Sequence, residues 1–257
     1  MIQLISETTI FLHLMRRISA YFISLLVITF ANPVIAQDSI KVPLNIRTGF
    51  DVFGPIYYSF KPDNFTMEGY AAFDYDIKKS IVIETGYQNF KYSQYNYNYL
   101  SKGIFFKFGM DFNLIKPFQA EGKYFGGIGV RYGISFYSSG VPSFKHENYW
   151  GTGTGAIPTA NHIAHFVEVN PGIRTQIFKN VSIGWNIRLR LLISGGSGID
   201  QKSVSIPGFG NGTKTFSPGI NYYISINIPY KSVFVKPEVE KAPESDAIST
   251  TTDKKIN

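Results

Sequence analysis

The sequence predicts an all-β protein, an eight-stranded antiparallel up-and-down transmembrane β-barrel. Three observations support this fold class: eight segments in which apolar and polar residues alternate, connections that alternate between short and long, and an N-terminal export signal. A period of two is typical of β-strands, because successive side chains point to opposite faces. The composition agrees, since 16% of the 257 residues are aromatic, with 22 Phe and 17 Tyr.

The N-terminal segment predicts export. Arg16 and Arg17 precede an apolar run over residues 18–31, and small residues lead up to Ala36. Together these form the three-region pattern of a cleaved signal peptide. We assign residues 1–36 to it, with Met15 as the start that fits the pattern. A membrane anchor helix is the alternative, but the apolar run is shorter than the ~20 residues that span a bilayer.

The alternating segments follow in order from Val42 to Tyr230. They are residues 42–52, 67–76, 81–90, 103–114, 124–136, 166–177, 181–193 and 219–230. Their apolar faces include, in the same order, Leu44, Met67, Ile83, Phe108, Val130, Val169, Trp185 and Ile224. Their polar faces include Arg47, Glu68, Glu84, Lys107, Arg131, Glu168, Arg188 and Gly219. Each segment therefore predicts one strand with two chemically different faces.

The connections alternate in length. Residues 76–80, 117–123 and 178–181 are short links, whereas the links over residues 54–66, 91–102, 137–162 and 194–215 are long. Outer-membrane barrels have short periplasmic turns and longer external loops. An even number of strands also puts both termini at the short-turn end. We therefore expect a barrel over residues 37–230, with the long loops outside the cell.

The last 27 residues differ in composition from the barrel. Residues 231–257 are rich in Pro, Glu, Lys, Ser and Thr and have few apolar side chains. Such a segment buries too little surface to offset the entropy lost on ordering. We expect it to be a disordered periplasmic tail.

Charge decides which face of the sheet points inward. Six basic and six acidic side chains lie on the polar face: Arg47, Lys107, Arg131, Arg174, Arg188, Arg190, Asp51, Glu68, Asp74, Glu84, Asp111 and Glu168. A charge that faces lipid costs ~2–4 kcal/mol at the bilayer midplane. Twelve of them would exceed the ~5–15 kcal/mol by which a domain is stable. The charged face must therefore line the bore.

The bore of an eight-stranded barrel is just wide enough to be filled by side chains. We therefore expect the inward charges to pair with one another and to plug it. The predicted lumen charge network consists of Arg47, Asp51, Glu84, Lys107, Asp111, Arg131, Glu168, Arg174, Arg188 and Arg190. Nine glycines on the same face would make room for the arginines and carboxylates. A narrow pore is one alternative, and a soluble secreted β-barrel with its apolar face buried is another.

The long loops contain the candidates for binding at the cell surface. These are Tyr95, Tyr97, His146, Glu147, Tyr149 and Trp150. A lipid hydrolase or acyltransferase that uses a histidine at the rim is an alternative function. However, the spacing of the histidines matches no triad and no metal signature, so we predict no catalytic residue, no metal and no cofactor.

Three sequence blocks resemble a known family. KYSQYNYNYLSKGIFFKFGMDFNL (91–114), HENYWGTGTGAIP (146–158) and IPGFGNG (206–212) are similar to an uncharacterised family of predicted outer-membrane β-barrel proteins from Gram-negative Bacteroidota. The resemblance covers about residues 42–230 and implies the same fold and location, but no activity. The last strand also resembles the aromatic-ended signal read by the barrel-assembly machinery, although 27 residues follow Tyr230.

These observations define the expected partners and role. The net charge of +7 is spread along the chain, so there is no basic stripe of the kind that binds nucleic acid. We expect outer-membrane lipid and lipopolysaccharide to surround the barrel, and the barrel-assembly machinery to insert it. The predicted location is the outer membrane of the Gram-negative cell envelope, and the predicted role is structural or surface-binding.

Overall fold

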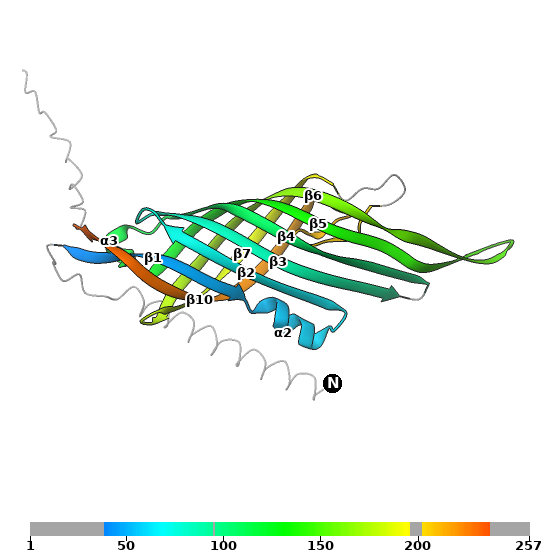
Figure 1. Cartoon of the computed structure of the whole chain (residues 1–257), viewed down its shortest axis with the longest axis horizontal. Coiled ribbons are helices and arrows are strands. Elements are labelled where there is room, and N and C mark those ends of the chain that lie inside the picture. The colour runs from blue at the N-terminus through cyan, green and yellow to red at the C-terminus, as the bar shows by residue number, and fades with distance from the viewer. Residues whose placement is uncertain (1–38, 95, 196–201, 237–257) are drawn as a thin grey trace, which may run out of the picture. The chain divides into compact units, whose positions relative to one another are not determined.

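The computed structural model describes residues 39–94, 96–195 and 202–236, and it folds them into a closed barrel (Figure 1). The barrel strands are β1 (Ile40–Asp51), β2 (Asn64–Asp74), β3 (Lys79–Gln94), β4 (Tyr97–Asn113), β5 (Tyr124–Asn148), β6 (Gly151–Phe178), β7 (Val181–Ser194) and β10 (Phe216–Val235). Their order around the barrel is β1-β10-β7-β6-β5-β4-β3-β2, and every pair is antiparallel. The predicted eight-stranded up-and-down barrel is confirmed.

The two faces of the wall have the orientation expected from charge. Lys107 is fully buried and Arg131 is 3% exposed, whereas Phe108 is 56% and Trp185 is 40% exposed. The alternation of the sequence therefore separates a charged bore from an apolar outer surface.

The connections at one end of the barrel are short. Residues 75–78 and 179–180 link β2 to β3 and β6 to β7, and residues 114–123 contain the single turn α3 (Pro117–Ala120). Ile40 of β1 pairs with Val235 of β10, and a Cβ on Gly122 would lie 2.8 Å from Pro43. The start of β1 therefore lies beside the short-turn connection over 114–123, as an even strand number requires.

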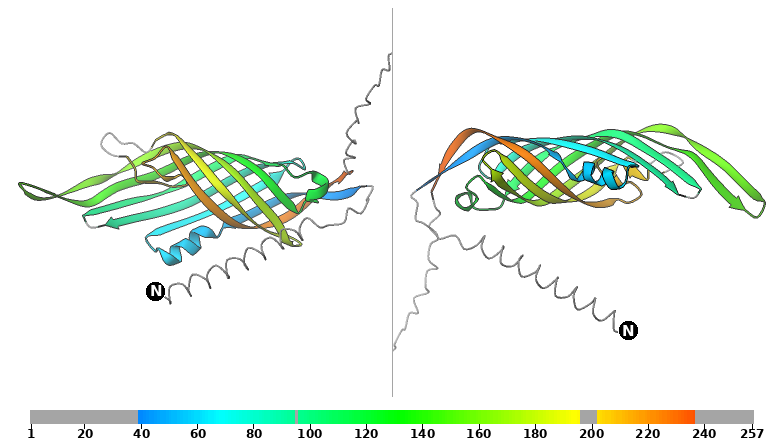
Figure 2. Two further views of the ribbon diagram at one scale, coloured as in Figure 1. Left: turned by 180° about the vertical axis from the view of Figure 1, so that it is seen from behind. Right: turned by 90° about the horizontal axis from the view of Figure 1, so that it is seen from below.

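The connections at the opposite end are mostly structured. Residues 54–66, expected as a loop, contain the helix α2 (Phe53–Phe60) and the start of β2. Residues 91–102 and 137–162 are also not loops, because β3 and β4 are separated only by 95–96, and β5 and β6 only by 149–150. The hairpin of β5 and β6 extends beyond the neighbouring strands in Figures 1 and 2.

Aromatic rings over glycines explain why the β5–β6 link is a hairpin. Phe144 pairs with Gly155, and His146 pairs with Gly153. Cβ atoms built on these glycines would lie 2.5 Å from the Phe144 ring and 2.3 Å from the His146 ring. Each ring therefore covers a glycine on the partner strand, a device that fixes register in β-sheets.

The first strand departs from simple alternation. Val42 and Leu44, expected to face lipid, are buried inside together with Asn45 and Arg47. The register between β1 and β10 shifts between Leu44 and Asn45, which inverts the faces of the first residues. Val42, Leu44, Ala120 and Phe125 give the short-turn end of the bore an apolar lining.

The ends of the chain differ in part from expectation. β10 continues through Val235, so residues 231–235, expected in the tail, pair with β1. The predicted signal peptide (1–36) and residues 237–257 of the predicted tail lie outside the described residues. Neither α2 nor α3 has the length or apolar character of a membrane-spanning helix, and this holds for every helix in the described ranges.

Candidate functional site: the bore and the external rim

A lysine lies at the centre of the charged bore. Lys107 Nζ is 3.3 Å from a carboxylate oxygen of each of Glu68, Glu84 and Glu168. The register explains the arrangement, because Glu84 on β3 is directly opposite Lys107 on β4. Glu168 on β6 is opposite both Arg131 and Arg190, one on each neighbouring strand.

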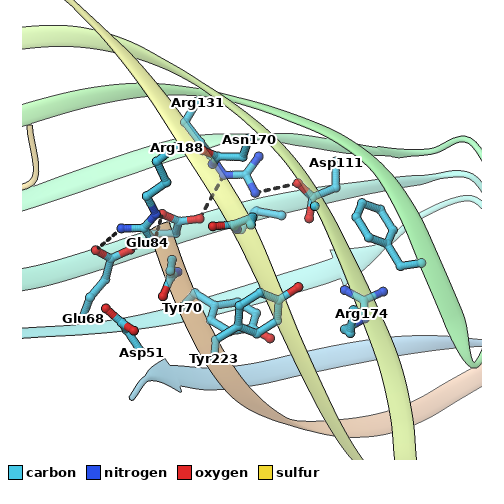
Figure 3. A pocket seen from close by; sticks show the side chains of 15 residues that line it. Asp51, Glu68, Tyr70, Glu84, Asp111, Arg131, Asn170, Arg174, Arg188 and Tyr223 are labelled. Atoms are coloured by element: carbon cyan, nitrogen blue, oxygen red, sulfur yellow. Dashed lines mark hydrogen bonds and ion pairs between the residues drawn. The ribbon is translucent and has the colours of Figure 1, made fainter. Parts of the chain in front are cut away.

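Three arginines extend this cluster across the bore, and Figure 3 shows two of them, Arg131 and Arg188. Arg131 donates to Glu84 at 3.1 Å and to Asp111 at 2.6 Å. Arg188 donates to Glu68 at 2.8 Å, and Arg190 donates to Glu168 at 2.8 Å. With Lys107, these residues form the central charge cluster, which has four cations and four carboxylates: Lys107, Arg131, Arg188, Arg190, Glu68, Glu84, Asp111 and Glu168.

This balance decides the electrostatics of the bore. A buried charge that loses its partner costs ~3–5 kcal/mol. Each member of the central charge cluster has at least one partner of opposite sign, and its four cations and four carboxylates make the ionised cluster neutral as a whole.

Three residues of the expected network lie apart from the central charge cluster. Arg47 pairs with Asp74. Asp51 accepts a hydrogen bond from the backbone N–H of Phe53 at 2.8 Å, at the start of α2. Arg174 lies over the ring of Phe125, 4.9 Å from its centroid. Within the described part of the chain, no ion pair includes Asp51 or Arg174, so the expectation that the inward charges pair with one another does not hold for these two residues.

A small polar cavity of about 30 Å³ adjoins the central charge cluster. Tyr70, Arg174 and Tyr223 line it beside Glu84 and Arg188, as Figure 3 shows. The lining also includes four buried oxygens without a hydrogen-bond partner, on Tyr70, Asn170, Asn186 and Asn221. A water needs about 10–15 Å³ of such space and two to four polar partners. The cavity therefore has the size and chemistry for one or two water molecules.

The inward glycines make room for rings as well as for charges. Cβ atoms on Gly129 and Gly219 would lie 2.9 Å from the guanidinium groups of Arg131 and Arg190. On Gly86 and Gly133, however, they would lie 2.4 Å and 2.3 Å from the rings of Phe105 and Phe166. The glycines therefore make room for arginines, as expected, and also for the aromatic rings in the external half of the bore.

The link between β7 and β10 enters this aromatic half. We call residues 202–215 the inserted segment; it contains the two short strands β8 (Ser205–Ile206) and β9 (Gly210–Asn211). Ile206 and Phe209 are fully buried against Tyr137, Ala164 and Phe166. Gly208 and Gly210 have φ of 75° and 106°, which only glycine adopts readily, and Gly208 lies in the turn between β8 and β9.

Hydrogen bonds from the wall hold the inserted segment. Tyr99 accepts one from Val204 N–H at 3.1 Å, and Ser101 donates one to the carbonyl of Ser205 at 2.9 Å. Arg190 donates to the carbonyl of Phe209 at 2.7 Å, which connects the segment to the central charge cluster. Sequence reasoning missed this feature, although apolar Ile206, Pro207 and Phe209 in a link between strands were a signal for it.

The expected surface-binding residues do not converge. Tyr149 and Trp150, 93% and 89% exposed, form the tip of the β5–β6 hairpin. His146 lies over Gly153 and Glu147 pairs with Thr152, so successive positions place them on opposite faces. Tyr97 packs against Tyr92 on β3, with 6.4 Å between ring centroids. Tyr95 lies outside the described residues.

The remaining histidines are also separate. His165 Nδ1 is 2.9 Å from the hydroxyl of Tyr132, and His162 packs against the ring of Tyr137. The described segments hold no group of His, Asp and Glu that could bind a metal ion.

A family model described as "Domain of unknown function (DUF6048)" matches residues 11–232. No curated protein matches the sequence. Similar solved structures include Ail, the attachment invasion locus protein of Yersinia pestis, with 6% identity, a TM-score of 0.35, and coverage of 72% of this chain and 97% of that chain.

Two further structures are similar. The N-terminal β-barrel domain of Pseudomonas aeruginosa OprF has 9% identity and a TM-score of 0.29, with 75% of this chain and 98% of that chain covered. Neisserial surface protein A has 9% identity and a TM-score of 0.32, with 73% and 95% covered.

Proposed function

This chain belongs to the DUF6048 family, and we propose that it is a small outer-membrane barrel with a closed bore that acts at the cell surface through its external rim. In this proposal, residues 1–36 export the chain, and the barrel-assembly machinery inserts it into the outer membrane of a Gram-negative bacterium of the Bacteroidota. Lipid and lipopolysaccharide surround the barrel.

The outer face of the barrel supports the membrane location. Every barrel strand exposes large apolar side chains there, among them Phe50, Phe73, Ile83, Phe108, Val130, Ile173, Trp185 and Ile224. Soluble monomers rarely expose a contiguous apolar patch larger than a few hundred Å². In a soluble barrel these residues would be the core, yet the interior here contains Lys107 and Arg188 instead. The arrangement therefore favours lipid over water as the surroundings.

The observation that supports the proposed role is that two groups of buried side chains occupy the bore. The central charge cluster fills its middle, and the inserted segment fills its external half. The space left beside the cluster is about 30 Å³. This favours a role on the outside over transport through the bore.

Cysteine labelling tests the location and the orientation, because the chain has no cysteine of its own. We expect Tyr149→Cys, at the hairpin tip, to react with a membrane-impermeant maleimide in intact cells. Lys78→Cys, in the short turn between β2 and β3, is the matched control and should react only after the outer membrane is permeabilised. Both variants should migrate differently on gels before and after boiling. Labelling of both sites in intact cells, or recovery of the protein in the soluble fraction, would refute the proposal.

A further inference from the structure

The outer face of β3, β4, β5 and β6 changes from apolar to polar between one outward-facing residue and the next on each strand. Tyr87, Ile104, Phe136 and Ile163 are neighbours across these strands and form an apolar row, each 39–53% exposed. Two residues further toward the external rim, Asn89, Lys102, Ser138 and Asn161 form a polar row in the same register. The boundary between the two rows follows the hydrogen-bond register across four strands, which tilt relative to the barrel axis.

Aromatic rings pack beside this boundary at its β2 edge. The ring of Tyr87 is 6.3 Å from that of Phe65 on β2, and Phe65 is 5.3 Å from Tyr58 on α2. Belts of tyrosine and other aromatic side chains are typical of the level of lipid headgroups. The apolar row therefore belongs to the hydrocarbon side of the boundary, and the polar row to the headgroup side.

The wall is hollowed at this boundary. A groove of about 700 Å³ is lined by both rows, including Ile104, Phe136 and Ile163 on the apolar side and Lys102, Ser138 and Asn161 on the polar side. Its lining contains no carboxylate. Lys102 is exposed, and among the described residues it takes part in no ion pair. The groove thus offers one uncompensated cation above an apolar surface.

We propose that this groove binds an anionic lipid of the outer leaflet, with the phosphate of its headgroup at Lys102 and an acyl chain along Ile104, Phe136 and Ile163. The ammonium group of Lys102 and the polar side chains of Ser138 and Asn161 supply hydrogen-bond donors for phosphate oxygens. A free phosphate would use only this polar half. The apolar row would contact an acyl chain, which a free phosphate lacks, and the proposed occupant is therefore a lipid. The inference rests on the proposed membrane location.

Native mass spectrometry of the detergent-released protein tests the site. The purified chain is reconstituted into vesicles of phosphatidylglycerol and phosphatidylcholine, released, and assayed for retained lipid. We expect the wild type to retain one phosphatidylglycerol, and Lys102→Gln to lower that retention about fivefold, as ~1 kcal/mol per lysine near a membrane surface implies. Lys102→Arg should restore retention. Lys145→Gln, which removes the same charge from the β5–β6 hairpin, is the control and should match the wild type.

Several outcomes would overturn the site. If Lys145→Gln and Lys102→Gln lowered the retention of phosphatidylglycerol equally, the lipid would be attracted by the positive charge of the protein in general and not by this groove. Competition by inorganic phosphate at the same concentration as the lipid would assign the site to a free anion. If the wild type retained as much phosphatidylcholine as phosphatidylglycerol, Lys102 would not select an anionic headgroup. The boiled and unboiled gel mobility of each variant separates this result from the proposed function, because a heat-modifiable barrel that retains no anionic lipid contradicts the groove alone.

Discussion

At the scale of single residues, Lys107 has three ionic partners in the bore. Three glutamates lie 3.3 Å from its ammonium group, and the side chain is fully buried. Lys107→Met keeps most of the volume but leaves the cluster with one carboxylate in excess. We expect the free energy of unfolding to fall by ~3–5 kcal/mol, as for other buried pairs that lose one partner. Urea titration of the protein in lipid vesicles measures this change.

The control for this prediction is Lys145→Met on the exposed β5–β6 hairpin. It should change the free energy of unfolding by less than ~0.5 kcal/mol, as is usual for surface substitutions. If Lys107→Met changed the free energy of unfolding as little as the control, the stability of the barrel would not depend on the ion pairs of this lysine.

Gly133 gives a second prediction at this scale. A Cβ there would lie 2.3 Å from the ring of Phe166, so Gly133→Ala must displace a ring that is fully buried. We expect a loss of ~1–3 kcal/mol in the free energy of unfolding, as for other overpacked cores. Gly69→Ala is the matched control, because its Cβ would have only an ordinary contact of 3.6 Å. Equal stability of the two variants would contradict the packing described for Phe166.

At the scale of elements, the inserted segment depends on buried side chains and on a few hydrogen bonds from the wall, because it adds no strand to the barrel sheet. Its two short strands pair only with each other. Phe209 packs against Phe166 with 5.7 Å between ring centroids. Phe209→Ala removes this contact, and Phe→Ala in a core costs ~3–5 kcal/mol. We expect faster hydrogen exchange in residues 202–215 and little change in the strands of the barrel.

Hydrogen exchange followed by mass spectrometry separates these regions. The control is Phe216→Ala, at the outward-facing start of β10, where the side chain is 49% exposed. It should leave the exchange of the inserted segment unchanged. Faster exchange throughout the barrel in Phe209→Ala would mean that the segment and the barrel unfold together.

The elements also show what sequence alone predicts. All eight alternating segments became strands, because side-chain parity is a local property. The sequence predicts a loop over 137–162, where the structure has a hairpin. Glycines at 151, 153 and 155 are typical of loops, and only the pairing of the two strands places Phe144 and His146 across from two of them. The face of Val42 and Leu44 was wrong for a related reason. A register shift depends on the partner strand and leaves no trace in the period of β1 itself.

At the scale of the whole molecule, the alternation of side chains along a strand predicts whether a residue faces the bore or the outside. It does not predict the position of that residue along the barrel axis. Glu84 and Arg174 both point inward, yet only Glu84 reaches the central charge cluster. The position along the axis follows from strand tilt and stagger, which the closed barrel sets as a whole. The alternation of residues therefore predicts which charges face the bore, but it does not predict that Asp51 and Arg174 lie apart from the cluster. The inserted segment was missed because its packing exists only after the barrel has closed.

The proposed function places two closures of the bore in series, and this gives a prediction for conductance. The wild type should show no resolved single-channel current in planar bilayers. Replacing residues 203–212 by a short Gly-Ser linker removes the external closure only, and the current should stay unresolved because the central charge cluster still fills the bore.

Opening the inner closure requires a change that keeps the charges balanced. Glu68→Ala with Arg188→Ala removes two ionic partners at once and leaves three cations and three carboxylates in the central cluster. Because no charge is left in excess, the barrel should still fold. Combined with the linker, this pair of substitutions should give a small current that appears in neither change alone. A current in the wild type, or in the linker variant by itself, would contradict closure by the cluster, since either result requires a continuous path for ions past Lys107.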